Sequence, residues 1–528
     1  MKLSADIVIV GSGVGGGTLA SALAGSGARV LILERGKHLP REDENWNADA
    51  VFNQGRYATR ENWKDDRGKP YGANAYYHDG GASKMFGAAM FRFRERDFGA
   101  FETADGVSPA WPISYADLEP FYFRAEKLFG VRGVVGEDPT EPWRSSPFPH
   151  PAVQHSDRLE RGVVEALRRQ GLSPAHLPLA IDEGAGGSCQ RCATCDAYPC
   201  RVGAKGDAER RTVEVALQSD NVQLLTDARV RRIIAAPSGR SIVALEVVLA
   251  GEMATVNAAI FVVAAGAINS AKLLLASDHP RHSRGIANSA GHVGRNLMLH
   301  VSSAMVAVNP RQLEPIPFQK TLTINDFYFG RGGGDPPLGS VQTLGKLNEA
   351  SLRAGARWMP RMAAGWLLKR SVEWWLMTED LPDRSNQVSI DGSSLKIRYK
   401  PNNTIAHRRL VKRWASIMRS IGRPLTLSRA AGRASTSHQC GTVRFGRTPD
   451  EAALDPFCRT FDHTNLFVVD ASFFPSSAAL NPALTIAAQA LRVADHIAGL
   501  KLNEQVHRTS TPESATTATR RITRCPTR

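Results

Sequence analysis

Three glycines near the start of the chain, and one acidic residue after them, have the spacing of a dinucleotide-binding turn. Gly11, Gly13 and Gly16 follow the apolar run DIVIV in a G-x-G-x-x-G pattern. The first glycine permits a tight turn, the second lets the backbone approach a pyrophosphate, and the third lets the next helix pack closely. Glu34 follows about 20 residues later, where an acid accepts hydrogen bonds from ribose hydroxyls. These residues predict a bound dinucleotide, FAD or NAD.

Four cysteines form the second group of chemically capable residues. Cys189, Cys192, Cys195 and Cys200 lie in SCQRCATCDAYPCRVGAK. The spacing is similar to that of ferredoxin runs, although the last gap is longer and no proline follows. Three interpretations stay open: an iron–sulfur cluster, a tetrathiolate zinc site, and reduced or partly disulfide-linked thiols. We favour the third.

A strand–helix–strand unit positions the glycine turn. Asp6–Val10 reads as an apolar strand, Val14–Ala24 as a small-residue helix and Arg29–Leu33 as a second strand. This order places the amino terminus of the helix against a phosphate, as in other dinucleotide-binding folds.

Later segments predict a second region that mixes strands and helices. Residues 221–264 read as successive strands, and GAINSAKLLLAS from Gly266 opens a helix. Between about His300 and Ser428 strands alternate with helices such as Thr404–Ile421, which is an α+β pattern. A last helix is expected over Ala483–Ala498.

Composition indicates a soluble globular protein of two or three units. The chain has 528 residues, 42% of them hydrophobic, and a formal net charge of +15. The basic residues are dispersed except at the end, so we expect no nucleic-acid partner. No apolar run is long enough to span a bilayer and no cleavable leader is visible, so we expect a cytoplasmic protein, with peripheral membrane association or co-export with a partner as alternatives.

Several segments, taken in order, resemble one family of flavoproteins. HQCGTVRFG from His438 and LFVVDASFFPSSAALNPALTIAAQALRVADHI from Leu466, together with the glycine turn, resemble the glucose-methanol-choline (GMC) oxidoreductase family. GGASKMFGAAMFRFRERDF from Gly80 and GAINSAKLLLAS from Gly266 occur in the same order as in that family, as do HVGRNLMLH and EDLPDRSNQVSI. The resemblance spans the chain except its tail.

This resemblance implies an α/β fold with an α+β substrate domain. The FAD-binding domain is Rossmann-like and discontinuous, and the substrate domain is built on an antiparallel sheet. We expect residues 1–300 in the FAD-binding domain, including an irregular flavin loop (36–112) and the cysteine-rich segment (189–200). Residues 301–428 form the substrate-binding domain, 429–500 return to the FAD-binding domain with catalytic residues, and 501–528 form a disordered basic tail.

The resemblance also implies which residues bind FAD. Asp470 is expected near the ribityl and phosphate groups, and the backbone of Val230 at the adenine. Non-covalent binding is expected because no histidine stands where some members attach the flavin. The expected cofactor residues are Gly11, Gly13, Gly16, Glu34, Gly80, Gly81, Ser83, Val230, Asp470, Ala471 and Pro482.

For catalysis the resemblance points to His438 and Asn481. Histidine has an ordinary pKa of about 6.5 and accepts protons near neutrality, so His438 is expected to be the base. Asn481 is expected to stabilise the developing alkoxide. The reaction implied is oxidation of an alcohol, such as a sugar or polyol, to a carbonyl, with a quinone or a cytochrome as electron acceptor.

Alternative functions stay open. A flavin-bound lyase acting on hydroxynitriles, or a dehydrogenase passing electrons through an iron–sulfur cluster on Cys189, Cys192, Cys195 and Cys200 to a cytochrome, fits the same family. A NAD-dependent dehydrogenase or a non-catalytic binding module would each share the glycine turn.

The tryptophan-rich segment Leu352–Met377 is a further open feature. It suits a membrane interface or a substrate entrance. We favour a substrate-domain helix that packs its aromatic side chains inward.

Overall fold

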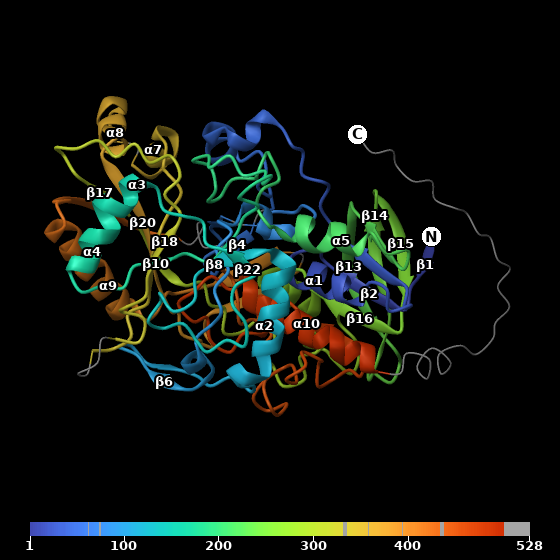
Figure 1. Cartoon of the computed structure of the whole chain (residues 1–528). Helices are drawn as coiled ribbons and strands as arrows, with labels where there is room; N and C mark the ends of the chain where they lie inside the picture. The colour runs from blue at the N-terminus through green and yellow to red at the C-terminus, as the bar shows by residue number, and fades with distance from the viewer. Residues whose placement is uncertain are drawn as a thin grey trace.

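Two sheets organise the molecule in its computed structural model, which describes residues 1–61, 63–72, 75–330, 335–356, 358–392, 394–432 and 438–500. One is a five-stranded parallel sheet in the order β12-β3-β2-β16-β24, and the other is a six-stranded sheet in the order β10-β18-β19-β20-β17-β23. In Figure 1 strands β2 and β16 lie in the right half of the molecule, and β17 and β20 in the left half. The predicted disordered tail, 501–528, lies outside the described residues.

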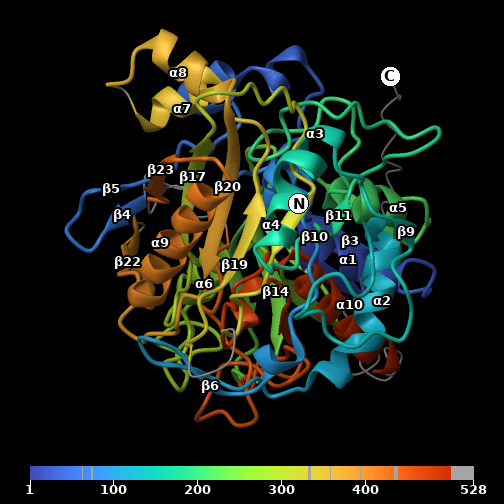
Figure 2. The same ribbon diagram turned by 60° about the vertical axis from the view of Figure 1, so that its left-hand side comes forward.

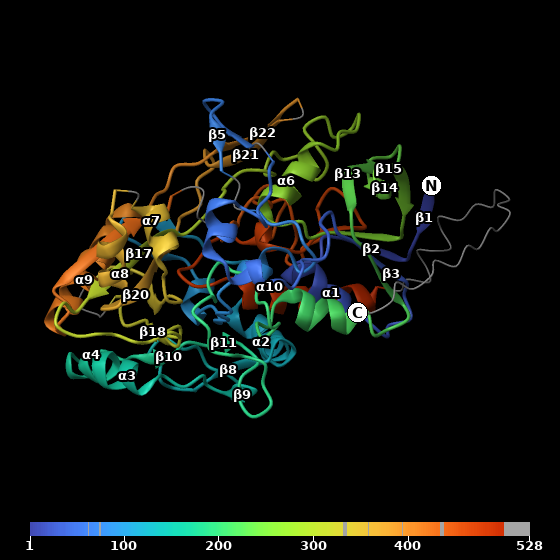
Figure 3. The same ribbon diagram turned by 90° about the horizontal axis from the view of Figure 1, so that it is seen from above.

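The parallel sheet confirms the predicted dinucleotide-binding start and its discontinuous origin. Strands β2, β3, β16 and β24 are buried along their whole length, as expected for a parallel sheet covered on both faces. The helices α1 and α10 lie side by side against each other (Figure 3). The bounds are β2 Ile7–Val10, α1 Val14–Leu23, β3 Val30–Leu33, β12 Val222–Leu225, β16 Ile260–Val263, β24 Leu466–Val468 and α10 Ala483–Gly499.

A four-stranded sheet lies beside this core in the order β1-β15-β14-β13, and helix α6 follows β16. The first strand of the chain joins it by parallel pairing with β15. These elements run over Lys2–Ser4 (β1), Ala228–Ala235 (β13), Ile242–Leu249 (β14), Glu252–Asn257 (β15) and Ala267–Leu275 (α6).

The six-stranded sheet is antiparallel throughout, as predicted for the substrate domain. Helix α9 (Thr404–Ser420) covers one face, where Trp414 stacks edge-on against Trp374 with ring centroids 4.8 Å apart. The strands are β10 Ala175–His176, β17 Val301–Val308, β18 Leu322–Ile324, β19 Ser340–Thr343, β20 Ser371–Thr378 and β23 Leu425–Ala430.

The domain boundary at residue 300 needs correction. The continuous helical run α3 (Asp157–Leu159), η5 (Glu160–Val164) and α4 (Glu165–Arg169) buries Leu159 and Leu167 in the core of the substrate domain, not in that of the nucleotide-binding domain. Strand β10 likewise belongs to the six-stranded sheet. The substrate domain therefore also includes residues before 300. The apolar side chains of this helical run pack in one core with the six-stranded sheet, most of whose strands come later in the chain.

The tryptophan-rich segment also departs from the favoured interpretation. It forms two short helices, α7 (Glu349–Gly355) and α8 (Arg361–Leu368), which project from the body of the molecule (Figure 2), and then strand β20. Trp374 is fully buried, but Trp358 is 80% exposed and Trp366 is 40% exposed. Inward packing therefore holds for Trp374, holds in part for its half-buried neighbour Trp375 in the same strand, and is wrong for Trp358 and Trp366.

The remaining elements are short, apart from helix α2. They are β4 Trp63–Asp65, β5 Pro70–Tyr71, η1 Asp43–Trp46, η2 Asp49–Asn53, η3 Gly81–Met85, η4 Glu95–Phe98, β6 Phe101–Glu102, β7 Val107–Ser108, α2 Tyr115–Phe129, β8 Val131–Gly133, β9 His150–Pro151, β11 Leu179–Ala180, η6 Glu209–Val213, α5 Glu214–Ala216, β21 Gln387–Asp391, β22 Ser394–Arg398 and η8 Ala471–Phe473. No helix in the described parts of the chain combines the length and the apolar character needed to cross a bilayer.

Candidate active site

The glycine turn after β2 leaves no room for side chains. Gly11 has a φ of +103°, and a Cβ there would lie 2.4 Å from the carbonyl oxygen of Ala264. A Cβ on Gly16 would lie 2.0 Å from the carbonyl oxygen of Gly11. At Gly13, in contrast, the nearest heavy atom to a Cβ is 4.0 Å away. Protein atoms therefore require the first and third glycines, whereas the space beside the second suits the close approach of a ligand.

The flavin loop packs directly on this turn. A Cβ on Gly81 would lie 3.1 Å from the Cα of Gly13, and the backbone N–H of Gly80 donates to Ser12 Oγ at 3.1 Å. Ser12 in turn donates to Glu34 through its hydroxyl (2.7 Å) and its N–H (3.1 Å). The sequence segments that were expected to bind one cofactor are thus in contact.

Other predicted cofactor residues surround the same turn. Asp470 follows β24 and accepts hydrogen bonds from Gly266 N at 3.0 Å and Ser472 N at 2.8 Å. A Cβ on Gly15 would lie only 1.8 Å from the carbonyl oxygen of Val469, which puts the first turn of α1 beside Asp470. Burial raises the pKa of the Asp470 carboxyl above its usual value.

The other predicted cofactor residues lie on the flavin loop, on β13 and beside α10. Ser83 Oγ donates to Gly80 O at 2.6 Å and accepts from Ala208 N at 2.9 Å, which fixes the flavin loop. Val230 lies in β13, whose first residue donates its N–H to Glu34 O at 2.9 Å. Ala471 is buried, and Pro482 immediately precedes α10.

His438 is paired with a second histidine to which the sequence had given no role. Met298 and Cys440 form a two-way backbone bridge, each N–H donating to the other's carbonyl oxygen at 3.0 Å. In an antiparallel pair, the residues two positions beyond such a bridge again lie opposite each other. His300 and His438 occupy these positions, and their Nδ1 atoms are 2.9 Å apart.

The hydrogen bonds of His300 fix the protonation of both rings. Its Nε2 lies 2.9 Å from the carbonyl oxygen of Ser477, which can only accept, so His300 Nε2 carries a hydrogen. A neutral His300 then offers a lone pair on Nδ1, and His438 must donate its own Nδ1 hydrogen to it. This assignment leaves His438 Nε2 as a free proton acceptor.

Both histidines are held neutral. Burial lowers the pKa of His300 to about 4. Burial, the neighbouring His300 and the positive charge of Lys320 together hold the pKa of the half-buried His438 well below its usual value. Lys320 is itself buried and paired with Asp196 of the cysteine-rich segment.

Asn481 lies on the same loop as the carbonyl that orients His300. Its Oδ1 accepts a hydrogen bond from Gln342 Nε2 at 3.0 Å. Because the oxygen faces Gln342, the Asn481 amide nitrogen faces away with its hydrogens available as donors. Ser340 Oγ also donates to Ala479 O at 2.7 Å, so strand β19 holds this loop at two points.

Gln342 belongs to a row of side chains on one face of the six-stranded sheet. Its register partners on the neighbouring strands are Thr323 and Trp375, and Trp375 is paired in turn with Ala304. Residues opposite each other on adjacent strands share a face, and this face is turned away from α9. Trp375 is half-buried there, beside a Gln342 Oε1 that has no hydrogen-bond partner among the described residues.

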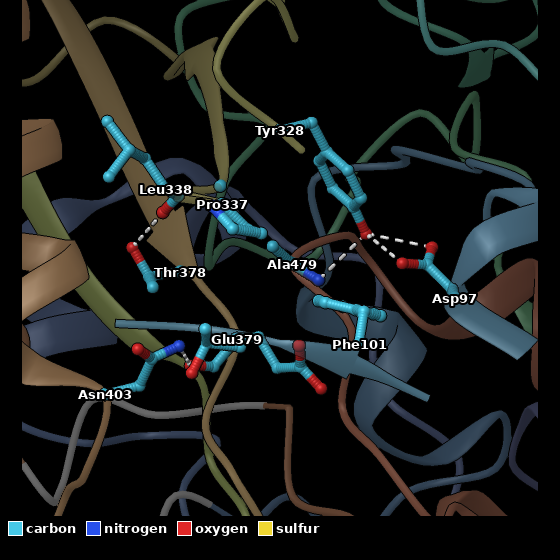
Figure 4. A pocket seen from close by; sticks show the side chains of 11 residues that line it. Asp97, Phe101, Tyr328, Pro337, Leu338, Thr378, Glu379, Asn403 and Ala479 are labelled. Atoms are coloured by element: carbon cyan, nitrogen blue, oxygen red, sulfur yellow. Dashed lines mark hydrogen bonds between the residues drawn. The ribbon is translucent and has the colours of Figure 1, made fainter. Parts of the chain in front are cut away.

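A small pocket adjoins the loop at Ala479 (Figure 4). There Tyr328 donates its hydroxyl hydrogen to Asp97 at 2.9 Å and accepts from Ala479 N at 3.1 Å. Glu379 lies in the same pocket, where burial and the nearby carboxyl groups of Asp97 and Asp380 raise its pKa to about 8.

The cysteine-rich segment packs on the flavin loop through a buried lysine. Lys205 Nζ donates to the carbonyl oxygens of Phe86 at 2.8 Å and Cys195 at 3.1 Å. A thiol hydrogen bond from Cys195 lowers the pKa of Cys192 to about 5.

The four thiols do not form a compact ligand set. Within the described parts of the chain, the one group of three potential metal-ligand atoms within 4.8 Å of one another is His38, Asp79 and Glu209, and no cysteine belongs to it. A single zinc ion would need four sulfurs at such separations. The choice between free thiols and a larger cluster on Cys189, Cys192, Cys195 and Cys200 stays a prediction.

The structure thus groups around one turn the residues Gly11, Gly13, Gly16, Glu34, Gly80, Gly81, Ser83 and Asp470. A cofactor contact of Val230, Ala471 or Pro482 stays a prediction. Asn481 lies on the loop whose Ser477 carbonyl oxygen binds the His300–His438 pair. The structure adds three residues that sequence reasoning missed: His300, Gln342 and Lys320. His300 ends the segment HVGRNLMLH, which resembles a segment of the flavoprotein family. The presence of a second histidine in that segment was the only sequence evidence for His300. Gln342 and Lys320 carry no local pattern at all.

Comparisons with known proteins show what the whole chain is similar to. Family models described as GMC oxidoreductase match residues 78–302 and 393–490. The chain is 32% identical to 6'''-hydroxyparomomycin C oxidase of Streptomyces lividus, covering 93% of this chain and 92% of that protein. It is 28% identical to the large subunit of fructose dehydrogenase of Gluconobacter japonicus, covering 94% and 98%. The crystal structure of pyridoxine 4-oxidase from Mesorbium loti has the same fold, with a TM-score of 0.66 at 22% identity over 93% of this chain and 98% of that one.

Proposed function

The chain belongs to the GMC oxidoreductase family, and on that premise we propose that it is an FAD-dependent enzyme whose His438 removes the hydroxyl proton of an alcohol. The overall reaction is oxidation of a CH–OH group to a carbonyl. The observation that carries the residue assignment is the hydrogen-bonded chain from Ser477 O through His300 to His438, which leaves His438 Nε2 as a base.

The glycine turn fits FAD. The open space beside Gly13, the uncapped amino terminus of α1 and the acid Glu34 suit a pyrophosphate and a ribose. Gly80, Gly81, Ser83, Asp470 and Pro482 are further residues that would hold the cofactor. The bound flavin supplies the hydride acceptor for alcohol oxidation. With no histidine assigned to attachment, we propose that the cofactor is held non-covalently.

His438 acts as a base because it is neutral and correctly protonated. Its Nδ1 hydrogen is engaged by His300, so the lone pair on Nε2 is the one available to take the substrate hydroxyl proton. Its lowered pKa keeps this lone pair free at neutral pH. His300 is a positioning residue: it selects the tautomer and the ring orientation without touching the alcohol.

Asn481 complements the base by donating to the alcohol oxygen. Gln342 holds its amide so that the nitrogen, not the oxygen, faces away from the sheet. A donor placed in this way stabilises negative charge on the oxygen as the proton leaves. Gln342 is therefore a second positioning residue for the reaction.

We propose a sugar or another polyol as the substrate class. Two relatives carry names that refer to 6'''-hydroxyparomomycin C and to fructose. In addition, the half-buried ring of Trp375 offers an apolar surface on the same face of the sheet as Gln342.

For the electron acceptor we propose a quinone or a cytochrome. The supporting observation is the similarity to a dehydrogenase subunit over nearly the whole chain. Reduction of a quinone analogue that is much faster than oxygen consumption would support this assignment, and the reverse would contradict it.

Anaerobic flavin reduction tests the proposal. The purified protein is expected to be yellow, to release FAD on denaturation and to bleach when mixed with a polyol. His438→Ala should keep its FAD but reduce it about 100-fold or more slowly, because base catalysis is lost. His407→Ala, at a buried histidine of the substrate domain, serves as the control. Wild-type rates in His438→Ala would remove that residue from the mechanism.

A further inference from the structure

The α7–α8 hairpin exposes apolar side chains that the reaction does not use. Trp358 is 80% exposed, Met362 89%, Trp366 40% and the neighbouring Leu313 54%. We refer to these four residues as the hairpin patch. In Figure 2 the hairpin stands out beyond the six-stranded sheet, at one end of the molecule.

Helix α8 has two distinct faces. Ala364 and Leu368 are buried against the protein, whereas Met362 and Trp366 point outward with the same four-residue spacing. Leu313 joins the outward group because Glu314 N donates to Lys369 O at 2.8 Å, which holds its loop at the end of α8. Met362 and Trp366 therefore share the outward side of a packed helix, with Trp358 just before its start and Leu313 beside its end.

Basic residues accompany the hairpin patch along the chain. Residues 346–370 contain six lysines and arginines and one acid, Glu349. Arg311, Arg361, Lys369 and Arg370 form no ion pair with any described residue. Arg370 stacks its guanidinium 5.0 Å from the centroid of the Trp366 ring, so positive charge and an apolar ring lie side by side.

We propose that the hairpin patch docks the enzyme on the surface of an anionic lipid bilayer. Tryptophan and other apolar side chains enter the interface between head groups and acyl chains, while lysine and arginine pair with anionic head groups. A second copy of this chain fits the surface poorly, because it would bring the same positive charge against it. The patch does not depend on the active-site assignment, so this inference goes beyond the proposed function.

Vesicle co-sedimentation tests the docking surface. The holoenzyme is expected to sediment with vesicles of phosphatidylcholine and phosphatidylglycerol, less with phosphatidylcholine alone, and less at high salt. The combined variant Trp358→Ser, Met362→Ser, Trp366→Ser should partition at least about tenfold more weakly, because apolar insertion is lost. Its rate of flavin reduction by a soluble alcohol should stay at the wild-type level, which shows that it is folded.

Two controls separate this surface from others. Trp143→Ser removes a tryptophan that is 65% exposed on a loop beside α2, and it should bind vesicles like the wild type. A chain ending at residue 500 lacks the basic tail and should also bind. Failure of the wild type to sediment, or equal binding by the triple variant, would overturn the proposal. The proposal would also be overturned if the wild type formed a dimer, the triple variant were a monomer, and neither protein bound vesicles.

Discussion

The nucleotide-binding turn and the proposed catalytic site differ in which atoms of the chain build them. The turn is a main-chain structure: Gly11, Gly13 and Gly16 lie within one short stretch, and the absence of Cβ atoms is what they contribute. The proposed catalytic site is a side-chain structure: His300 and His438 are 138 positions apart and meet through their rings. Substitutions in the first region should therefore remove the cofactor, and those in the second should slow the reaction of an enzyme that keeps it.

Gly16→Val should give the largest effect. Its side chain would meet the Gly11 carbonyl oxygen, which cannot move aside, so we expect a loss of about 3 kcal/mol or more in the free energy of unfolding, together with loss of FAD. Thermal denaturation and flavin absorbance measure both. Gly13→Ala sharpens the comparison, since no protein atom lies close there: it should fold normally yet bind FAD more weakly. Normal FAD content in Gly16→Val would contradict the packing argument.

His300→Leu tests whether the proposed catalytic site acts through side-chain chemistry. His438 would lose its Nδ1 partner and thus its fixed tautomer, so flavin reduction should slow by about tenfold or more while FAD is retained. His407→Leu is the matched control, because His407 is also buried, with a pKa lowered to about 4, but hydrogen-bonds Ser303 and Thr378. Equal slowing in both variants would indicate a general loss of packing.

Gln342→Leu and Asn481→Ala test the hydrogen-bonded pair of amides in the proposed catalytic site. If Gln342 acts by orienting Asn481, each single variant slows flavin reduction and the double variant is little worse than Asn481→Ala. The coupling energy should be about 1 kcal/mol, as for one hydrogen bond. Additive effects would mean that Gln342 acts on the substrate separately. The asparagine substitution should affect the rate of reduction more than substrate binding.

The pH dependence of flavin reduction distinguishes the two regions without a mutation. The pKa of His438 is lowered, so the ring stays in its basic form at neutral pH. The rate should be level from about pH 8 down to about pH 6 and fall only below that, through the lowered pKa. FAD content should not change over this range. A fall centred at the ordinary histidine pKa would argue against the buried histidine pair.

Glu379→Gln should have the smallest effect, on stability alone. The folded pKa of Glu379 is raised to about 8, so the folded protein holds a proton there that the unfolded chain releases above its ordinary pKa. Stability is therefore lost as pH rises from about 4.5 to about 8. The amide keeps the hydrogen bond from Ser108 and should raise the melting temperature at pH 8 but not at pH 5. An equal shift at both values would contradict the ionisation argument.

The amino-acid sequence by itself determined the elements whose signals are local. The strand–helix–strand start, helix α9 and helix α10 appear within a residue or two of their predicted bounds. Backbone requirements such as those of the glycine turn, and apolar periodicity along a helix, depend on neighbours in the chain. For the same reason Gly11, Gly13, Gly16 and Glu34 could be predicted from spacing alone, whereas the other expected cofactor residues were implied by the segments that resemble the family.

Tertiary structure alone decided the contacts between distant segments. The pairing of His300 with His438, the contact of Gln342 with Asn481 and the exposure of Trp358 leave no local pattern. The helical run 157–169 shows the same limit: Leu159 and Leu167 join a core formed mainly by residues much later in the chain. Side-chain contacts of this kind depend on how two sheets pack against each other, and that packing is set by the whole chain at once.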